Sequence, residues 1–150
     1  MAATTTAKNA CNVAIWLDND AGSPTDISGS LNKAGVRPTQ KIGEFEVFQY
    51  EWTKRLCCGR DVEFQLSIVY TTAAAEGWDV VKDWIYGNTP CTKRTLSIYV
   101  PDKNVGSDHF SAEVIWVEAP MVLDRGDPGP IMIEMILKPD GIVNHSVTTT

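Results

Sequence analysis

The stretch "DVEFQLSIVY", from Asp61 to Tyr70, decides the fold of this chain. Apolar and polar side chains alternate along it, so an extended backbone would be apolar on one side and polar on the other. This period of two is typical of a β-strand with one face on a core and one in water. The expected core face is Val62, Phe64, Leu66, Ile68 and Tyr70, and the expected wet face is Asp61, Glu63, Gln65, Ser67 and Val69.

Other segments on both sides of this stretch also read as strands. They are short or alternating apolar runs that end at clusters of Gly, Pro, Asp or Asn. The order is strands, one helix and then strands again, without the regular alternation of strand and helix that gives parallel sheets. The sequence therefore predicts a mainly antiparallel sheet with one helix. The further strands are expected in "NVAIWLD" (12–18), "RTLSIYV" (94–100), "HFSAEVIWVEAP" (109–120) and "IMIEMILKP" (131–139).

The helix is expected at about residues 73–86, within "TTAAAEGWDVVKDWIYGN". Its apolar residues recur at the spacing of one helix face. Thr72 is suited to cap its start, and Gly87 is suited to a left-handed position after its last turn. Gly77 weakens the helix by about 1 kcal/mol relative to Ala, so the helix is expected to depend on tertiary packing. The face consists of Ala74, Trp78, Val81 and Ile85, with Trp84 as a second anchor.

The segment before the deciding strand is less regular. In "KIGEFEVFQYEW" (41–52) the alternation slips, which predicts a bulge or a strand that passes from one sheet to another. "KRLCCGR" (54–60) concentrates three basic residues around Gly59 and is expected to be a loop. "DISGSLNKAGVRP" (26–38) predicts a short strand or an irregular crossing, because two glycines and a proline interrupt it.

Length and composition favour one domain with a real core. The chain has 150 residues, of which 43% are hydrophobic and 21% are charged. We expect a single domain at 12–141, flanked by arms at 1–11 and 142–150. The start lacks a signal peptide pattern and no apolar run approaches the roughly 20 residues that span a membrane, so a soluble chain is expected.

Charge and cysteine content exclude several classes of function. The formal net charge of -6 argues against a protein that wraps nucleic acid, although DNA could still pass nearby without adhering. Four cysteines without a CxxC pair make a structural zinc site and a disulfide scaffold poor interpretations. Reduced thiols in a protein made in the cytoplasm are expected.

The acidic stretch "IWLDNDAGSPTDIS" (15–28) raises the question of a calcium site. An EF-hand loop needs Gly at position six and Glu at position twelve. Counting from Asp18, these positions hold Ser23 and Gly29. The expected structure is a turn in which Asp and Asn side chains bond nearby backbone amides. No metal and no cofactor are predicted, although an irregular calcium site remains an alternative.

No catalytic constellation stands out, so an enzyme is not predicted. His109 and His145 are far apart in sequence and near no nucleophile motif. Paired carboxylates at 44 and 46 and at 61 and 63 allow a weak hydrolase hypothesis, but such pairs usually form the solvent side of a strand. The RGD tripeptide at Arg125–Asp127 is expected to be part of a tight loop.

Taken in order, several motifs resemble the tail tube (major tail) proteins of long-tailed bacteriophages. They are the "NVAIWLDNDAGSPTDIS" opening, the aromatic hairpin region, "VEFQLSIVY", "TTAAAEGWDVVKDWIYG" and the closing "IMIEMILKPDG". The resemblance covers nearly the whole chain, and the paired Cys57 and Cys58, the aromatic "FQYEW" and the Ile/Met-rich last strand depart from it. It implies an antiparallel β-sandwich or barrel with one flanking helix, related to the inner tubes of contractile tails and type VI secretion systems.

The resemblance also implies a structural role in the virion tail. Six subunits would form a ring, and rings would stack into a hollow tube whose inner strands join into a barrel around the lumen. Partners would be further copies of the chain, the tape measure protein, and tail terminator and distal tail proteins. Genomic DNA would pass through the lumen without specific binding, and no membrane would be involved.

Two groups of residues are candidates for these surfaces. A polar, acidic lumen face that repels DNA is expected from Asp61, Glu63, Gln65 and Ser67, with Glu44 and Glu46 as companions. Contacts between stacked rings are expected from Lys54, Arg55 and Arg60, paired with Asp18, Asp20 or Asp26 of the next ring.

Other functions remain open at this point. A monomeric β-sandwich could bind carbohydrate on Phe48, Tyr50 and Trp52, which share one face in the strand interpretation. Within a phage particle, a neck, tail terminator or head decoration protein is the nearest alternative.

Overall fold

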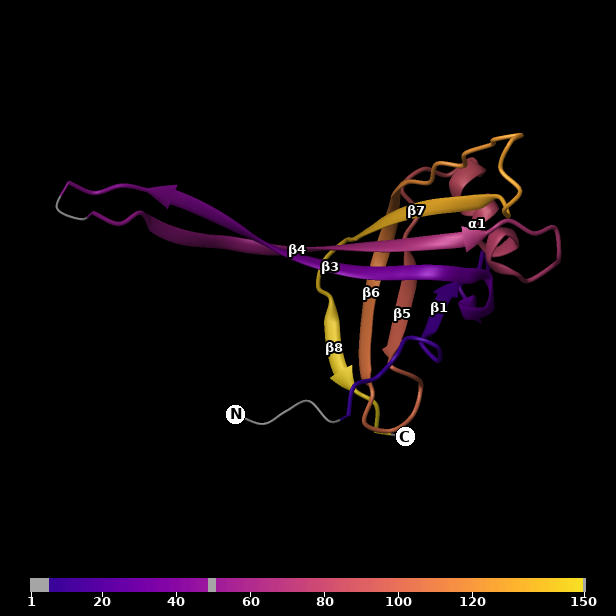
Figure 1. The fold of residues 1–150 in the computed structure, drawn as a ribbon, viewed down its shortest axis with the longest axis horizontal. Coiled ribbons are helices and arrows are strands. Elements are labelled where there is room, and N and C mark those ends of the chain that lie inside the picture. The colour runs from indigo at the N-terminus through magenta and orange to yellow at the C-terminus, as the bar shows by residue number, and fades with distance from the viewer. Residues whose placement is uncertain (1–5, 49–50, 150) are drawn as a thin grey trace.

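The computed structural model describes residues 6–48 and 51–149 (Figure 1). The part of the chain that it describes forms eight strands, one α-helix and one short 3-10 helix. In chain order these are β1 (Ala14–Asp18), β2 (Pro24–Asp26), η1 (Ser28–Ser30), β3 (Leu31–Phe45), β4 (Lys54–Val69), α1 (Gly77–Tyr86), β5 (Arg94–Val100), β6 (Asp108–Glu118), β7 (Met132–Pro139) and β8 (Asn144–Val147).

The strands form one antiparallel sheet that bends over itself. Its order is β2-β1-β5-β6-β7-β4-β3, and β8 pairs with β6 on the side that β7 occupies further along. In Figure 1, β1, β5 and β6 run across the direction of β3, β4 and β7, so the two halves form separate layers. The mainly antiparallel fold with a single α-helix is therefore confirmed.

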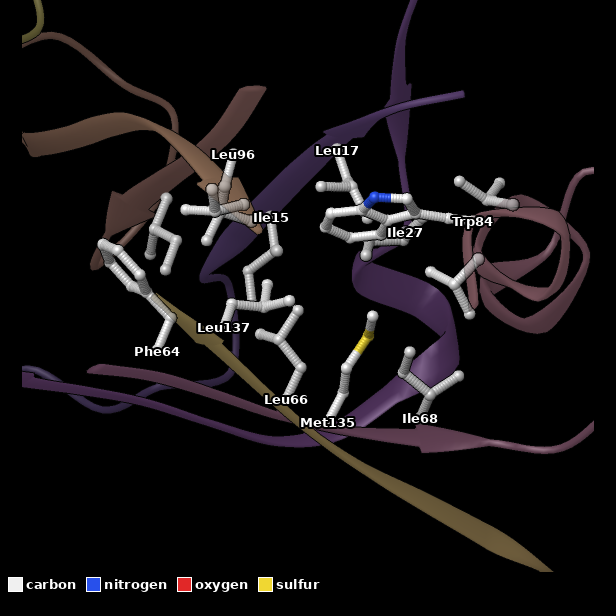
Figure 2. Packing of buried hydrophobic residues seen from close by; sticks show 14 of the residues in the cluster. Ile15, Leu17, Ile27, Phe64, Leu66, Ile68, Trp84, Leu96, Met135 and Leu137 are labelled. Atoms are coloured by element: carbon white, nitrogen blue, oxygen red, sulfur yellow. The ribbon is translucent and has the colours of Figure 1, made fainter. Parts of the chain in front are cut away.

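The core lies between the two layers (Figure 2). The expected alternation in β4 is confirmed, because Phe64, Leu66 and Ile68 are at most 1% exposed. Full burial of a side chain of this size contributes about 1.5–3 kcal/mol. The other buried members come from β1, the turn before η1, α1, β5, β6 and β7, and include Ile15, Leu17, Ile27, Trp84, Leu96, Val114, Met135 and Leu137.

Helix α1 begins at Gly77, later than the predicted start near residue 73. Ala75 has a φ of 63°, which breaks the helical backbone before Gly77. The backbone N–H of Gly77 donates to the buried Ser30 Oγ over 2.8 Å, so the first turn is capped from a distant part of the chain and not by Thr72. The predicted left-handed Gly87 is also wrong, because its φ is -73°.

A long hairpin of β3 and β4 extends beyond the rest of the molecule (Figure 1). Strand β7 pairs with β4 only from Phe64 to Val69, whereas β3 continues to pair with β4 as far as Lys54. We call residues 40–60 the hairpin arm. The segment 54–60, which was expected to be a loop, is thus the first part of β4. Its extended form is fixed by pairing with β3, with a register shift at Cys58.

Part of the expected C-terminal arm belongs to the sheet. Residues 144–147 form β8, which pairs with β6 from Asp108 to Ser111. All four residues of β8 are exposed, so backbone pairing and not side-chain burial holds the strand. At the other terminus, residues 6–11 are exposed. Within residues 6–48 and 51–149, no helix is long and apolar enough to cross a membrane.

Candidate interaction surfaces

The polar side of β4 faces away from the core, as expected. Asp61 and Gln65 are exposed, and Glu63 and Ser67 are half-buried. The Gln65 amide donates to Glu63 Oε1 over 2.9 Å. These four residues therefore form one continuous polar row along the outer side of the β3, β4 and β7 layer.

This outer surface is mixed in charge rather than acidic. Arg37 of β3 lies opposite Glu63, and Lys33 lies opposite Ser67. On β7, the Lys138 ammonium group is 3.6 Å from an Asp61 carboxylate oxygen. Three basic residues (Lys33, Arg37, Lys138) thus face three acidic ones (Asp61, Glu63, Glu134) on these strands. The sequence of β4 alone could not reveal the compensation, because the basic residues come from its neighbours.

Glu44 and Glu46 do not join that row. Both lie on the hairpin arm, and Glu44 pairs across the strands with Arg55. Side chains alternate along β3, so Glu44 is out of phase with Thr39, the residue opposite Asp61. Within one chain, Glu44 and Asp61 therefore lie on different faces of the hairpin, and a lumen role for Glu44 and Glu46 stays a prediction.

The basic residues of the hairpin arm are exposed. Lys54, Arg55 and Arg60 all lie in the first part of β4. Arg55 Nε donates to Glu44 Oε1 over 3.0 Å, and both side chains are more than half exposed. An exposed pair of this kind contributes about 0–1 kcal/mol, so it does little to hold the hairpin together.

Apolar side chains are exposed on both faces of the hairpin arm. Ile42 and Cys57 are opposite each other on one face, whereas Phe45 and Leu56 are on the other face by alternation. The exposed fractions are 49% for Ile42, 40% for Phe45 and 59% for Leu56. Within residues 6–48 and 51–149, no second layer covers this ribbon, which is typical of a surface that contacts another molecule.

The tip of the hairpin arm is also apolar. Phe48 and Trp52 are exposed, and Tyr50 lies outside the described residues. The two described aromatic residues suggested for carbohydrate binding therefore lie at the end of a projecting ribbon. Cys57 and Cys58 are free and exposed near the opposite end of the arm, beside Ile42 and Lys41, and Cys11 and Cys91 are free and exposed elsewhere.

The acidic opening stretch is a turn built as expected from side-chain to backbone bonds. The Asn19 side chain accepts from the N–H groups of Ala21 and Ser23 at 3.0 Å each. Asp26 Oδ1 accepts from the N–H of Ser28 over 2.9 Å. Within the described residues, no group of three or more His, Cys, Asp or Glu side chains is arranged to hold a metal ion.

A buried arginine, which sequence reasoning missed, organises this turn. Arg94 is 6% exposed, and its guanidinium group donates to the carbonyl oxygens of Asp18 and Val80 over 3.1 and 2.7 Å and pairs with Asp20. Burial lowers the pKa of Arg94, which Asp20 partly opposes. The signal was present in the sequence, since Arg94 is in phase with the inward-facing Leu96.

The candidate stacking residues thus lie in two separate places. Asp18 and Asp20 are engaged with β5, because Asp18 Oδ2 also accepts from the N–H of Thr95 over 3.3 Å. They lie beside β1 and β5 in the body of the molecule, away from the hairpin arm (Figure 1). Within one chain, the structure does not bring Lys54, Arg55 or Arg60 to them.

The two histidines occupy unrelated positions. The His145 ring is 2.7 Å from Asp108 Oδ1 and links β8 to β6. The His109 ring stacks on Tyr99 with 4.2 Å between the ring centres. Burial, and to a lesser extent the nearby Lys103, lower the pKa of His109.

Comparison with known proteins finds similarity in structure but not in sequence. No known family model matches the chain, and no curated protein matches its sequence. A chain from the C6-symmetric tail of an empty gene transfer agent (GTA) particle is 13% identical, with a TM-score of 0.68, over 93% of this chain and 99% of that chain.

Two further solved structures give the same result. A chain of the anti-feeding prophage (AFP) baseplate is 11% identical, with a TM-score of 0.72 and full coverage of both chains. A chain of the SPP1 tail tube is 12% identical, with a TM-score of 0.70, over 93% of this chain and 78% of that chain. At these identities the similarity establishes the fold, which is that of tail tube proteins.

Proposed function

We propose that this protein is the subunit of a bacteriophage tail tube, in which six-membered rings stack into a hollow conduit for DNA. The observation that carries the proposal is the hairpin arm, which exposes Ile42 on one face and Leu56 on the other. A ribbon that its own chain leaves uncovered on both faces is suited to lie between further copies. The tail tube fold supports the same role.

The channel lining in this proposal is the outer side of β3, β4 and β7. Its polar row on β4, from Asp61 to Ser67, offers no apolar or aromatic platform on which DNA bases could stack. Because Arg37 and Lys138 accompany the acids, the lining would carry paired charges and little net charge. Weak attraction and weak repulsion alternate on such a surface, which allows a polyanion to slide.

Ring stacking in this proposal uses the hairpin arm. The arm carries four basic and three acidic residues, a net charge of +1, so the rest of the chain carries -6 - 1 = -7. Arg55 and Arg60 share one face of the arm and would meet acidic residues of the next ring, and Lys54 would add a contact from the other face. Asp26, which is exposed and bonded to Ser28 of its own turn, suits this role better than Asp18 or Asp20, which are engaged with β5.

The other proposed partners are the proteins that a tail tube needs inside its channel and at its two ends. A tape measure protein would fill the channel before DNA, and terminator and distal tail proteins would close the two ends. The protein would be made in the host cytoplasm and end in the virion tail, with no enzymatic step and no cofactor.

Electron microscopy of the purified protein tests the proposal. We expect hollow tubes or stacked rings, with sixfold symmetry in end views. A chain that stays monomeric under all assembly conditions would contradict it. The matched variants are Leu56→Asp in the hairpin arm, which is expected to abolish tubes, and Ile142→Asp, which changes an even more exposed residue elsewhere and should leave tubes intact.

The channel lining has its own test. In a reconstituted phage, the double variant Asp61→Lys with Glu63→Lys should form tubes of normal length but slow DNA release, because four like-charged basic groups would then meet at Arg37 and Lys138. The control is Glu113→Lys on β6, which lies outside this layer. Normal release from the double variant would remove these residues from the lumen.

A further inference from the structure

The loop between β6 and β7, residues 119–131, exposes a second apolar surface. Its residues Val122 and Leu123 are adjacent in sequence, and 76% and 71% of their surfaces are exposed. Two neighbouring aliphatic side chains in water are a common feature of contact sites when a complementary apolar surface exists. The hairpin arm provides such a surface.

Short-range hydrogen bonds hold this loop in a defined shape. Asp124 Oδ1 accepts from the N–H of Gly126 over 2.9 Å, and Asp127 Oδ1 accepts from the N–H of Gly129 over 2.8 Å. The N–H of Asp127 also donates to the carbonyl of Asp124 over 3.2 Å. These bonds shape residues 124–129, and the bridge between Met121 and Ile133 ties the loop to β7 just before the apolar pair. Order on both sides of the pair lowers the entropic cost of binding.

The loop and the hairpin arm have complementary charge. Asp124 and Asp127 outweigh Arg125 within residues 119–131, whereas the arm carries a net charge of +1. Each aspartate uses one carboxylate oxygen for the loop itself and keeps another for a partner. On the arm, Lys41 and Lys54 share the face of Leu56, because Lys54 lies opposite Phe45 and Lys41 is two residues from Gly43, which lies opposite Leu56.

The two surfaces lie at opposite ends of the molecule. In Figure 1, the hairpin arm projects at the far left of the longest axis, and the loop between β6 and β7 lies at the right, near α1. One chain therefore cannot satisfy both surfaces. Contact between unlike surfaces of identical subunits is heterologous, and it repeats without limit when it does not close into a ring.

We propose that the loop at residues 119–131 is the seat for the hairpin arm of a second copy of this chain. Phe45 and Leu56 share one face of the arm and pack against Val122 and Leu123. Basic residues beside them meet Asp124 and Asp127 at the edge of the contact. This proposal rests on the proposed tube function, to which it adds the receiving surface on the neighbouring copy. Each contact is weak alone, and repetition around a ring multiplies its effect.

Photo-crosslinking in assembled tubes tests the contact directly. A benzophenone amino acid replaces Leu123, tubes are formed and irradiated, and the crosslinked peptides are identified by mass spectrometry. The expected product joins residue 123 of one copy to residues 40–60 of another. The same group at Ile142, which is 81% exposed, should not reach the arm. Crosslinks from residue 123 to any other segment, or no crosslinks, would contradict the proposal that this loop binds the hairpin arm of a second copy.

Charge exchange provides a second readout. Asp124→Lys with Asp127→Lys should reduce tube yield about tenfold, as should Lys41→Glu with Lys54→Glu, and combining all four changes should restore most of the yield. The absence of restoration would contradict a direct contact. Failure of the wild-type chain to form tubes would contradict the proposed function. Wild-type tubes without the crosslink would contradict only the contact between the loop and the hairpin arm.

Discussion

The body and the hairpin arm share the same two strands but use them differently. In the body, Phe64, Leu66 and Ile68 of β4 are at most 1% exposed, because a second layer covers them. In the arm, Leu56 of the same strand is 59% exposed, and β3 is its only partner strand. Backbone pairing alone is therefore enough to extend the ribbon. Side chains are buried only where the second layer covers the strands, and that buried part contributes most of the stability.

The largest expected effect is the difference in stability lost when one leucine is truncated in the body and one in the hairpin arm. Leu66→Ala should lower the free energy of unfolding by about 3 kcal/mol, because it removes buried methyl groups and leaves a cavity. Leu56→Ala should change it by less than about 0.5 kcal/mol, as is usual for exposed positions. Denaturant titration measures both. Equal losses would mean that the arm belongs to the folding unit.

The next effect concerns buried and exposed arginines. Arg94→Met should cost about 2 kcal/mol, because the carbonyl oxygens of Asp18 and Val80 lose their donor in a buried place. Arg55→Met in the arm removes only an exposed ion pair with Glu44 and should cost less than about 1 kcal/mol. The same titration checks the ranking. A cost for Arg55→Met as large as that for Arg94→Met would contradict this account.

Glycine substitutions sharpen the comparison further. A Cβ at Gly77 would lie 2.8 Å from the Cβ of Ser30 and 3.1 Å from Ile68 Cγ2, so Gly77→Ala should destabilise by about 1 kcal/mol despite the higher helix propensity of Ala. At Gly43 in the arm, the nearest atom is Cys58 Sγ at 3.9 Å, an ordinary contact, and Gly43→Ala should be tolerated. Thermal unfolding of both variants is the measurement. A stabilised Gly77→Ala variant would show that α1 can move away from Ser30.

The smallest expected effect is a pH dependence that belongs to the body. The pKa of His109 is lowered in the fold, so the unfolded chain takes up its proton first as the pH falls. Stability should be full above the ordinary histidine pKa of about 6.5 and decrease as the pH falls below it. His109→Gln should flatten this decrease when unfolding is compared at several pH values. An unchanged slope would assign the dependence to other groups.

Much of the body could be predicted from the sequence, because the alternation of apolar and polar residues along its strands indicates which face is buried. The inward positions Phe64, Leu66 and Ile68 of β4 are confirmed, whereas Tyr70, just after the strand ends, is 36% exposed. The start of α1 could not be predicted, because its capping group is Ser30, far away in the chain. The arm could not be predicted either. At residues 54–60 no layer distinguishes inside from outside, so the composition resembled that of a loop.

The same reasoning explains the candidate surfaces. Asp61, Glu63, Gln65 and Ser67 were placed correctly on one outer row of β4, since alternation within a strand is local. Their charge environment depends on Lys33, Arg37 and Lys138, whose positions follow only from strand order. Arg94 has a readable signal in its phase, although a charged side chain at the first position of a strand is more typical of an exposed strand end.

Hydrogen–deuterium exchange of free and assembled protein tests the central claim, that the hairpin arm serves assembly and not the stability of the fold. In the free chain, amides at residues 54–60 should exchange much faster than those at 64–69, although both belong to β4. In assembled material, exchange at 54–60 should slow towards that of the body. An arm as protected as the body in the free chain, or one that gains no protection on assembly, would contradict the claim.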